Sequence, residues 1–206
     1  MCELAEEKKN YENARAIENT VKEFLFHSLS KSNALPMCDL GREGLEKTPE
    51  RVRKAWEYFL SGYTEDPAEI LKTFEDGAKN YDEMVTVKDI PFYSMCEHHL
   101  LPFFGHVTIA YIPKGKIVGL SKLARLVEVF CRRLQVQERM TCQIANALQE
   151  CLQPEGVGVY VKARHLCMEA RGIEKQGHIT MTTAFRGVFR KEMDPASEFL
   201  SICHNG

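Results

Sequence analysis

The first third of the chain carries apolar residues at helical spacing. Between residues 11 and 31 they recur every three or four positions and predict an amphipathic helix: Ala14, Ile17, Val21, Phe24, Leu25 and Leu29. The stretch KSNALP (31–36) breaks this pattern. Thr48 and Pro49 mark the start of a second helix that should run to about residue 60, and a short helix is expected at 67–73. We therefore expect an N-terminal helical region over residues 1–77.

The pattern changes after the stretch GAKN (77–80), which is the best candidate for a domain boundary. Residues 84–90 are rich in β-forming side chains and partly alternate between apolar and polar. Residues 106–112 and 116–120 are two more β-like runs, and the Pro-Lys-Gly sequence at 113–115 between them is typical of a turn. These two runs are predicted to form a β-hairpin.

Two helices should follow, over residues 121–133 and 137–152. Further strands are expected at 156–163 and 178–185, and Asp194 with the proline after it should open a short final helix. Helices, strands, paired helices and strands in that order predict an α+β fold with antiparallel hairpins rather than βαβ units. We assign this second domain to residues 78–206.

Composition fits an ordinary globular protein, with 206 residues of which 44% are hydrophobic and 27% charged. No apolar run approaches the roughly 20 residues of a membrane span. The charged N-terminus has no apolar segment typical of a secretory signal. We therefore expect a cytoplasmic protein that does not bind a membrane. There the eight cysteines should be mostly reduced, and the question is which of them could hold a metal.

The net charge of −2 conceals an asymmetry between the two parts of the chain. Residues 1–90 contain 13 Lys and Arg against 19 Asp and Glu, whereas residues 91–206 contain 14 against 10. The second part therefore carries a net positive charge, as a binding site for an anionic ligand would require. The excess is too small to indicate nucleic acid as a partner.

A cysteine and two adjacent histidines lie within the stretch SMCEHHLLP (94–102). Cys96 and His99 have the Cys-x-x-His spacing that can bring a thiolate and an imidazole onto one ion, although this pair alone is a weak signal. Adjacent side chains point in different directions and cannot easily bind the same ion. One of His98 and His99 should therefore bind, leaving the other free for proton transfer or simply on the surface.

The stretch RHLC (164–167) supplies further candidates directly after a predicted strand. His165 and Cys167 are two residues apart, so they point the same way in extended backbone. Spacing leaves open whether His165 is a ligand or an acid–base group. Mixtures of cysteine and histidine bind zinc, and three protein ligands leave a fourth position for a water molecule that can act as a nucleophile.

Cations gather at the start of the helix predicted from the stretch GLSKLAR (119–125), where Ser121 could be the cap. Lys122 and Arg125 are three residues apart near the helix N-terminus, whose free N–H groups suit phosphate. Arg171 could add a third cation. From this segment alone, a solvated basic face is the favoured interpretation.

Gln137 and Glu138 lie in the first turn of the next predicted helix. A carboxylate is favoured at that position in any helix, which is the simpler interpretation. A carboxylate there could also accept two hydrogen bonds from an N–H/NH2 edge such as that of guanine.

Taken together, these motifs resemble the GTP cyclohydrolase I family. The resemblance covers about residues 48–190, and its stretches occur in the family's order: DEMVTV (82–87), SMCEHH (94–99), YIP (111–113), GLSKLAR (119–125), QVQER (135–139), HLC (165–167) and ARG (170–172). It implies a T-fold, in which an antiparallel four-stranded sheet carries two helices on one face. It also implies a homodecamer of two pentamers, with active sites at subunit interfaces.

The resemblance further implies a role for each candidate. The implied zinc ligands are Cys96, His99 and Cys167. The implied acid–base histidines are His98 and His165. Guanine would be held by Glu138 with Gln137. The triphosphate and ribose would be held by Lys122, Arg125, Arg171 and Ser121.

The implied activity is hydrolysis of GTP at purine C8, with release of formate and rearrangement to 7,8-dihydroneopterin triphosphate. Two alternatives stay open. One is a non-catalytic, zinc-stabilised GTP sensor, which would bind the nucleotide and release no formate. The other is a different T-fold enzyme acting on a pterin or purine.

Overall fold

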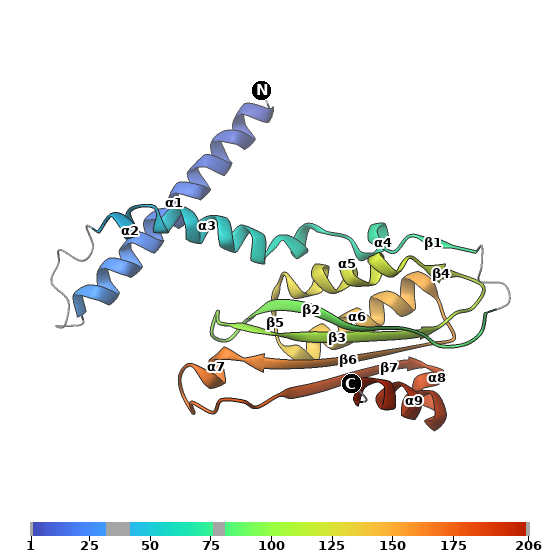
Figure 1. The fold of residues 1–206 in the computed structure, drawn as a ribbon. Helices are drawn as coiled ribbons and strands as arrows, with labels where there is room; N and C mark the ends of the chain where they lie inside the picture. Colours follow the sequence, from blue (N-terminus) through green and yellow to red (C-terminus); the bar gives the residue numbers. More distant parts are fainter. Residues whose placement is uncertain (1, 32–41, 76–80, 205–206) are drawn as a thin grey trace. The chain divides into compact units, whose positions relative to one another are not determined.

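The computed structural model describes residues 2–31, 42–75 and 81–204 (Figure 1). The contacts within the chain divide it into two compact units, residues 1–58 and 59–206. The domain boundary expected at residues 77–80 and the helix break expected after Lys31 lie outside the described residues.

The first unit is helical, as its apolar spacing predicts. It comprises α1 (Cys2–Lys31), α2 (Glu43–Glu46) and α3 (Thr48–Phe59). The helix expected at 11–31 is confirmed, and it begins earlier in the chain, at Cys2. The Arg53 guanidinium links α3 to α1, because its Nε donates to Glu18 Oε1 at 3.0 Å.

The second unit begins with three short elements: η2 (Ser61–Thr64), α4 (Pro67–Ile70) and β1 (Thr73–Phe74). Strand β1 pairs antiparallel with β4 (Ile117–Val118) in a separate two-stranded sheet. The predicted hairpin of 106–112 with 116–120 is therefore wrong. The chain turns at 113–115, and the strand that follows is only two residues long and pairs with β1 instead.

The main sheet has the order β5-β2-β3-β6-β7. Its four long strands are antiparallel: β2 (Val85–Cys96), β3 (Pro102–Ile112), β6 (Gly156–His165) and β7 (Thr180–Gly187). The short β5 (Leu134–Gln135) adds a parallel edge beside the end of β2. The expected four-stranded antiparallel sheet is confirmed, with this small fifth strand in addition.

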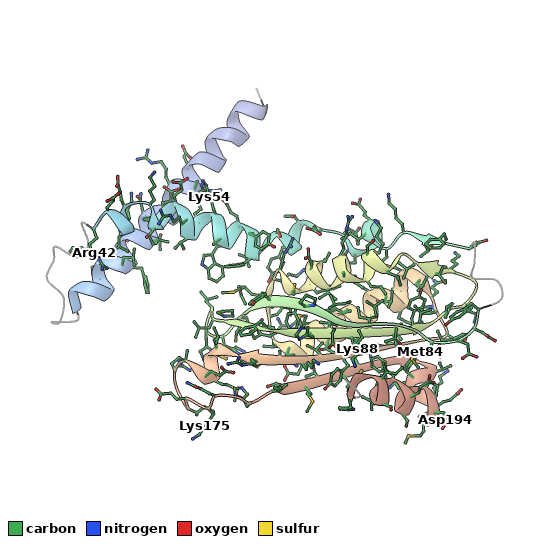
Figure 2. All side chains as sticks on the ribbon, viewed as in Figure 1. Arg42, Lys54, Met84, Lys88, Lys175 and Asp194 are labelled. Carbon is green, nitrogen blue, oxygen red and sulfur yellow. The ribbon has the colours of Figure 1, made fainter. Side chains whose placement is uncertain are left out.

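Helices α5 (Leu120–Cys131) and α6 (Gln137–Leu152) cover one face of the sheet (Figure 1). Alternate residues of the strands point towards them, and side chains fill the layer between (Figure 2). This main core includes fully buried residues from sheet and helices: Val107, Ile109, Val159, Val161, Leu123, Leu126, Ile144 and Leu148. The two-layer arrangement of sheet and paired helices is that of the T-fold.

A smaller cluster lies on the opposite face, beneath α8 (Val188–Lys191) and α9 (Met193–His204). Phe189 and Phe199 pack edge to face, with ring centroids 6.0 Å apart, against Tyr160 and Ala110 of the sheet. The final helix expected from Asp194 is therefore confirmed. Among the described helices, none combines the length and the apolar character that crossing a membrane would require.

Replacing Gly105 with alanine should destabilise the sheet by about 1–3 kcal/mol, as overpacking does. An added Cβ would lie 1.9 Å from the Lys162 carbonyl oxygen and 2.8 Å from Ala163 Cα, both in backbone that cannot rotate away. Urea unfolding at one fixed protein concentration measures the change. The control is Gly44→Ala, where the Cβ would have no atom within 4 Å. Equal midpoints for the two variants would contradict the prediction.

Candidate metal centre and active site

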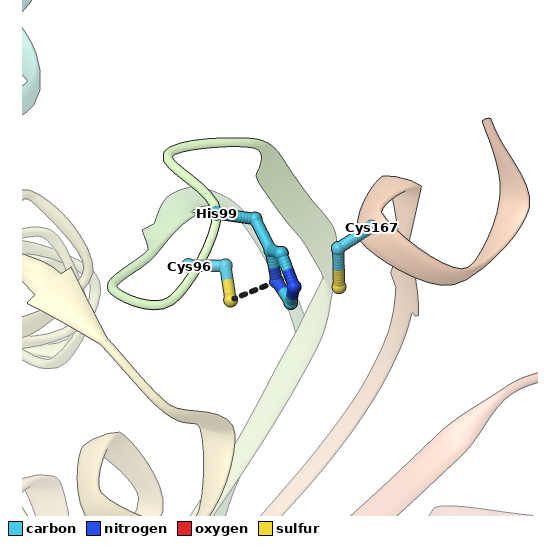
Figure 3. A group of neighbouring side chains, drawn as sticks. All are labelled: Cys96, His99 and Cys167. Atoms are coloured by element: carbon cyan, nitrogen blue, oxygen red, sulfur yellow. Dashed lines mark hydrogen bonds between the residues drawn. The ribbon is translucent and has the colours of Figure 1, made fainter. Parts of the chain in front are cut away.

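The turn between β2 and β3 positions the first two candidate ligands. Leu100 N–H donates to the Cys96 carbonyl at 2.9 Å, and Cys96 N–H donates to the Leu101 carbonyl at 2.9 Å. Leu100 takes the left-handed conformation that closes this tight turn, with φ of 53°. As a result the side chains of Cys96 and His99 point to the same side, with Sγ and Nδ1 3.7 Å apart (Figure 3).

The third candidate ligand, Cys167, follows just after β6, which lies beside β3 in the sheet. In the register, His165 at the end of β6 faces Phe103 at the start of β3, directly after the turn. The chain then enters α7 (Leu166–Glu169) and presents Cys167 to the turn (Figure 3). The ligand atoms of Cys96, His99 and Cys167 all lie within 4.8 Å of one another.

This cluster fits a metal ion. Burial raises the pKa of the Cys167 thiol, and the neighbouring Cys96 thiol raises it further. Two thiols this close cannot both ionise cheaply unless a cation lies between them. Two thiolates and one imidazole are a donor set that suits zinc. Cys96 is buried and His99 exposed, so the cluster opens to one side.

His165 lies beside the cluster and is held on two sides. Its ring stacks on Phe103 with centroids 4.9 Å apart and planes 3° apart. Its Nε2 lies 2.8 Å from Gln137 Oε1. Burial lowers the pKa of His165, and His178 lowers it further, while Glu138 and Glu169 act in the opposite direction. Burial therefore favours the neutral imidazole, the form that can accept a proton.

His98 is exposed next to the cluster and is not part of it. Its ring meets that of His99 edge to face, with centroids 6.1 Å apart. Its Nε2 lies 3.8 Å from Glu97 Oε1. Glu97 is fixed in turn by Arg139, whose Nη2 donates to Oε1 at 2.8 Å, and this hydrogen bond holds the pKa of the Glu97 carboxyl below its ordinary value.

The candidate substrate residues fall into two groups. Glu138 is exposed in the first turn of α6, close enough for its charge to act on His165. Arg171 is also exposed, and its Nη1 donates to the Cys167 carbonyl at 3.5 Å. Both therefore lie near the cluster. Gln137 differs from them, because its side chain is buried and its carboxamide is hydrogen-bonded within the protein.

The second group lies at the start of α5, away from the cluster. The helix begins at Leu120 with Gly119 as its cap, so Ser121 is not the cap that we predicted. The C-terminal end of α5 leads into β5, which pairs with Met95 and Cys96. Nine residues separate Lys122 from that end, or about 14 Å along the axis. The members of this group are Ser121, Lys122 and Arg125.

The sequence did not identify several neighbours of the site. His178 acts electrostatically on both His165 and Glu169, and its buried Nε2 has no hydrogen-bond partner among the described residues. Its position 11 residues beyond Cys167 gives no recognisable spacing. Phe103 has no signal of its own either, because an aromatic residue in a strand normally indicates core.

Comparisons with known proteins point to one family. The family model described as GTP cyclohydrolase I matches residues 34–204. A GTP cyclohydrolase 1 from Wolinella succinogenes is 60% identical over 163 residues, covering 79% of this chain and 86% of the relative. A GTP cyclohydrolase 1 from Janthinobacterium sp. (strain Marseille) is 58% identical over 161 residues, covering 78% and 81%.

Fold and site thus define a T-fold protein with three side chains that could hold a metal ion next to a half-buried histidine. The family match spans most of the chain and includes every residue of the cluster. The chain belongs to the GTP cyclohydrolase I family and is an enzyme of that class.

Proposed function

We propose that this protein is a zinc-dependent GTP cyclohydrolase I that catalyses the first step of pterin and folate biosynthesis. GTP and one water molecule would give formate and 7,8-dihydroneopterin triphosphate, with no redox cofactor. The observation that carries the proposal is the Cys96, His99 and Cys167 cluster beside His165, in a chain 58–60% identical to curated relatives of that name. Zinc bound there would supply a Lewis acid that activates water near purine C8.

Three side chains near the cluster have a part in this reaction. The Glu138 carboxylate accepts hydrogen bonds from the N–H/NH2 edge of guanine, which orients the purine. His98 and His165 move the protons: one must reach N7 as water adds at C8, and others move as the imidazole ring opens and formate leaves. The pKa of His165, lowered by burial, keeps its ring able to accept a proton.

Of the three cations proposed for the triphosphate, only one lies near the cluster among the residues that the structure describes. Arg171 is near Cys167. Lys122 and Arg125 lie in the first turns of α5, away from the cluster at the turn between β2 and β3. We propose that a neighbouring copy supplies these two residues and Ser121, so that active sites form at interfaces of a homodecamer. This distribution of the cations supports the proposal, and the protein's mass in solution would test it.

The remaining parts of the proposal concern the chain as a whole. We propose that residues 1–77 form an N-terminal helical region and residues 78–206 the catalytic domain. We also propose a cytoplasmic location without membrane or nucleic-acid partners. The six cysteines whose side chains are described are free thiols: Cys96, Cys131, Cys142, Cys151, Cys167 and Cys203.

Removal of the metal should abolish formate release from GTP. The purified protein is treated with a chelator, dialysed, and assayed before and after zinc is restored, with metal per chain measured in parallel. Formate that stops on chelation and returns with zinc is the expected result, because only the metal makes water a nucleophile at neutral pH.

Three other outcomes would contradict the proposal. Formate release that persists in metal-free protein would exclude the metal role. Binding of GTP and metal without any product would favour a sensor. Consumption of GTP or a pterin without formate would favour another T-fold enzyme.

A further inference from the structure

The side chain of Gln137 is buried and fully engaged at the start of α6, with only 1% of the residue exposed. Its Nε2 lies 3.2 Å from the Val161 carbonyl, 3.1 Å from the Thr180 carbonyl and 3.1 Å from Thr182 Oγ1. Its Oε1 lies 2.8 Å from His165 Nε2. The carboxamide therefore connects β6, the start of β7 and the His165 ring.

The two backbone carbonyls determine which end of the carboxamide faces His165. A carbonyl oxygen can only accept a hydrogen bond, so the amide nitrogen must face Val161 and Thr180. Rotating the carboxamide by 180° would set an oxygen against both carbonyls. It would leave buried groups without partners, at a cost of about 1–3 kcal/mol for each. The oxygen of Gln137 therefore faces His165.

Two threonines reinforce this orientation. Thr141 Oγ1 donates to the Gln137 backbone carbonyl at 2.7 Å and lies 2.7 Å from Thr182 Oγ1. With its own hydrogen used in this way, Thr141 must accept from Thr182. Thr182 then keeps a lone pair for the Gln137 amide. The Gln137 amide thus donates to Thr182, Thr182 donates to Thr141, and Thr141 donates to the Gln137 backbone carbonyl, so that the hydrogen bonds form a closed ring.

An oxygen acceptor facing His165 Nε2 requires that nitrogen to carry the hydrogen. In a neutral imidazole only one nitrogen is protonated, so Nδ1 then carries the lone pair. His165 Nδ1 makes no hydrogen bond to any of the described residues. Stacking on Phe103 fixes the plane of the ring, so the lone pair has one defined direction.

We propose that Gln137 is a positioning residue that fixes the tautomer of His165 with the hydrogen on Nε2 and leaves Nδ1 as the nitrogen available to the substrate. This rests on the proposed function, in which His165 transfers protons. It also assigns the Gln137 side chain to His165 rather than to the guanine that the family resemblance implies. Guanine recognition is left to Glu138.

Neutron diffraction from deuterium-exchanged crystals of the metal-loaded wild-type protein tests the tautomer directly. Deuterium on His165 Nε2 and none on Nδ1 is expected. An Nε2 without deuterium, or deuterium on Nδ1, would overturn the inference, whatever the activity of the protein. Absence of formate release from the same preparation would instead contradict the proposed function, so the two failures are distinguishable.

Kinetics separate positioning from guanine binding. Gln137→Leu should lower kcat for GTP about 10- to 100-fold, part of the roughly 10²–10⁴-fold that a positioned acid–base group contributes. Its KM and metal content should change little. A raised KM with unchanged kcat would mean that Gln137 contacts guanine and would overturn the inference. That pattern is expected of Glu138→Gln instead.

The matched control is Gln149→Leu, further along α6, where the amide donates to the Pro154 carbonyl at 3.2 Å. It removes a half-buried glutamine from the same helix without touching His165, and its kcat should equal that of the wild type. Should Gln137→Leu fail to fold, the neutron measurement on the wild-type protein still decides the question.

Discussion

Replacing Cys167 with alanine should cost the protein its metal and reduce formate release from GTP by more than about 100-fold. Loss of a residue that only hydrogen-bonds to a metal ligand lowers metal affinity or activity by roughly 10- to 100-fold. Loss of a ligand itself should lower both by more. The cluster has three donors within 4.8 Å, so the variant retains only Cys96 and His99. Metal per chain after dialysis and formate per GTP consumed are the measurements.

The control for this variant is Cys151→Ala. Cys151, like Cys167, is a half-buried free thiol, and it lies near the end of α6 against the main core rather than at the cluster. It should keep both metal and turnover. A Cys167→Ala protein that binds metal as tightly as the wild type would show that the thiol is not a ligand. Unchanged formate release would have the same meaning for the reaction.

The order of layers could be predicted from the sequence because burial imposes a period on each element. Val157, Val159 and Val161 alternate along β6 and face the helices, and the apolar stripe of α5 returns at helical spacing. Pairing between β1 and β4 could not be predicted in this way. Strands of two residues are too short to show alternation, and their partner is chosen by contacts far apart in the chain.

The site could be located from its residue types, but not resolved in detail. Cys96 and His99 lie in one turn, so their spacing carries the signal, whereas Cys167 reaches them only through the register of β6 against β3. Gln137 and Glu138 illustrate the limit best. Consecutive helix residues point about 100° apart, so one of them must be more buried than the other. Only the packing of α6 on β6 and β7 decides that Gln137 is the buried one.

Replacing His165 with serine should leave the metal bound while formate release falls about 10²- to 10⁴-fold, the usual contribution of a positioned acid–base group. The ring lies beside the cluster but is not one of its three ligands. Loss of its stacking on Phe103 should cost about 0.5–1.5 kcal/mol of folding free energy, too little to unfold a typical domain.

The control is His106→Ser, because His106 is exposed on β3 and lies outside the proposed site. It should keep normal turnover. Metal content, formate release at saturating GTP and urea unfolding are measured on both variants. Normal turnover in His165→Ser would remove His165 from the mechanism, and with it the reason for Gln137 to face that ring. Loss of turnover together with loss of metal would make His165 a ligand in solution. Loss of turnover with metal retained would separate proton transfer from metal binding, which the two thiols and His99 would then serve alone.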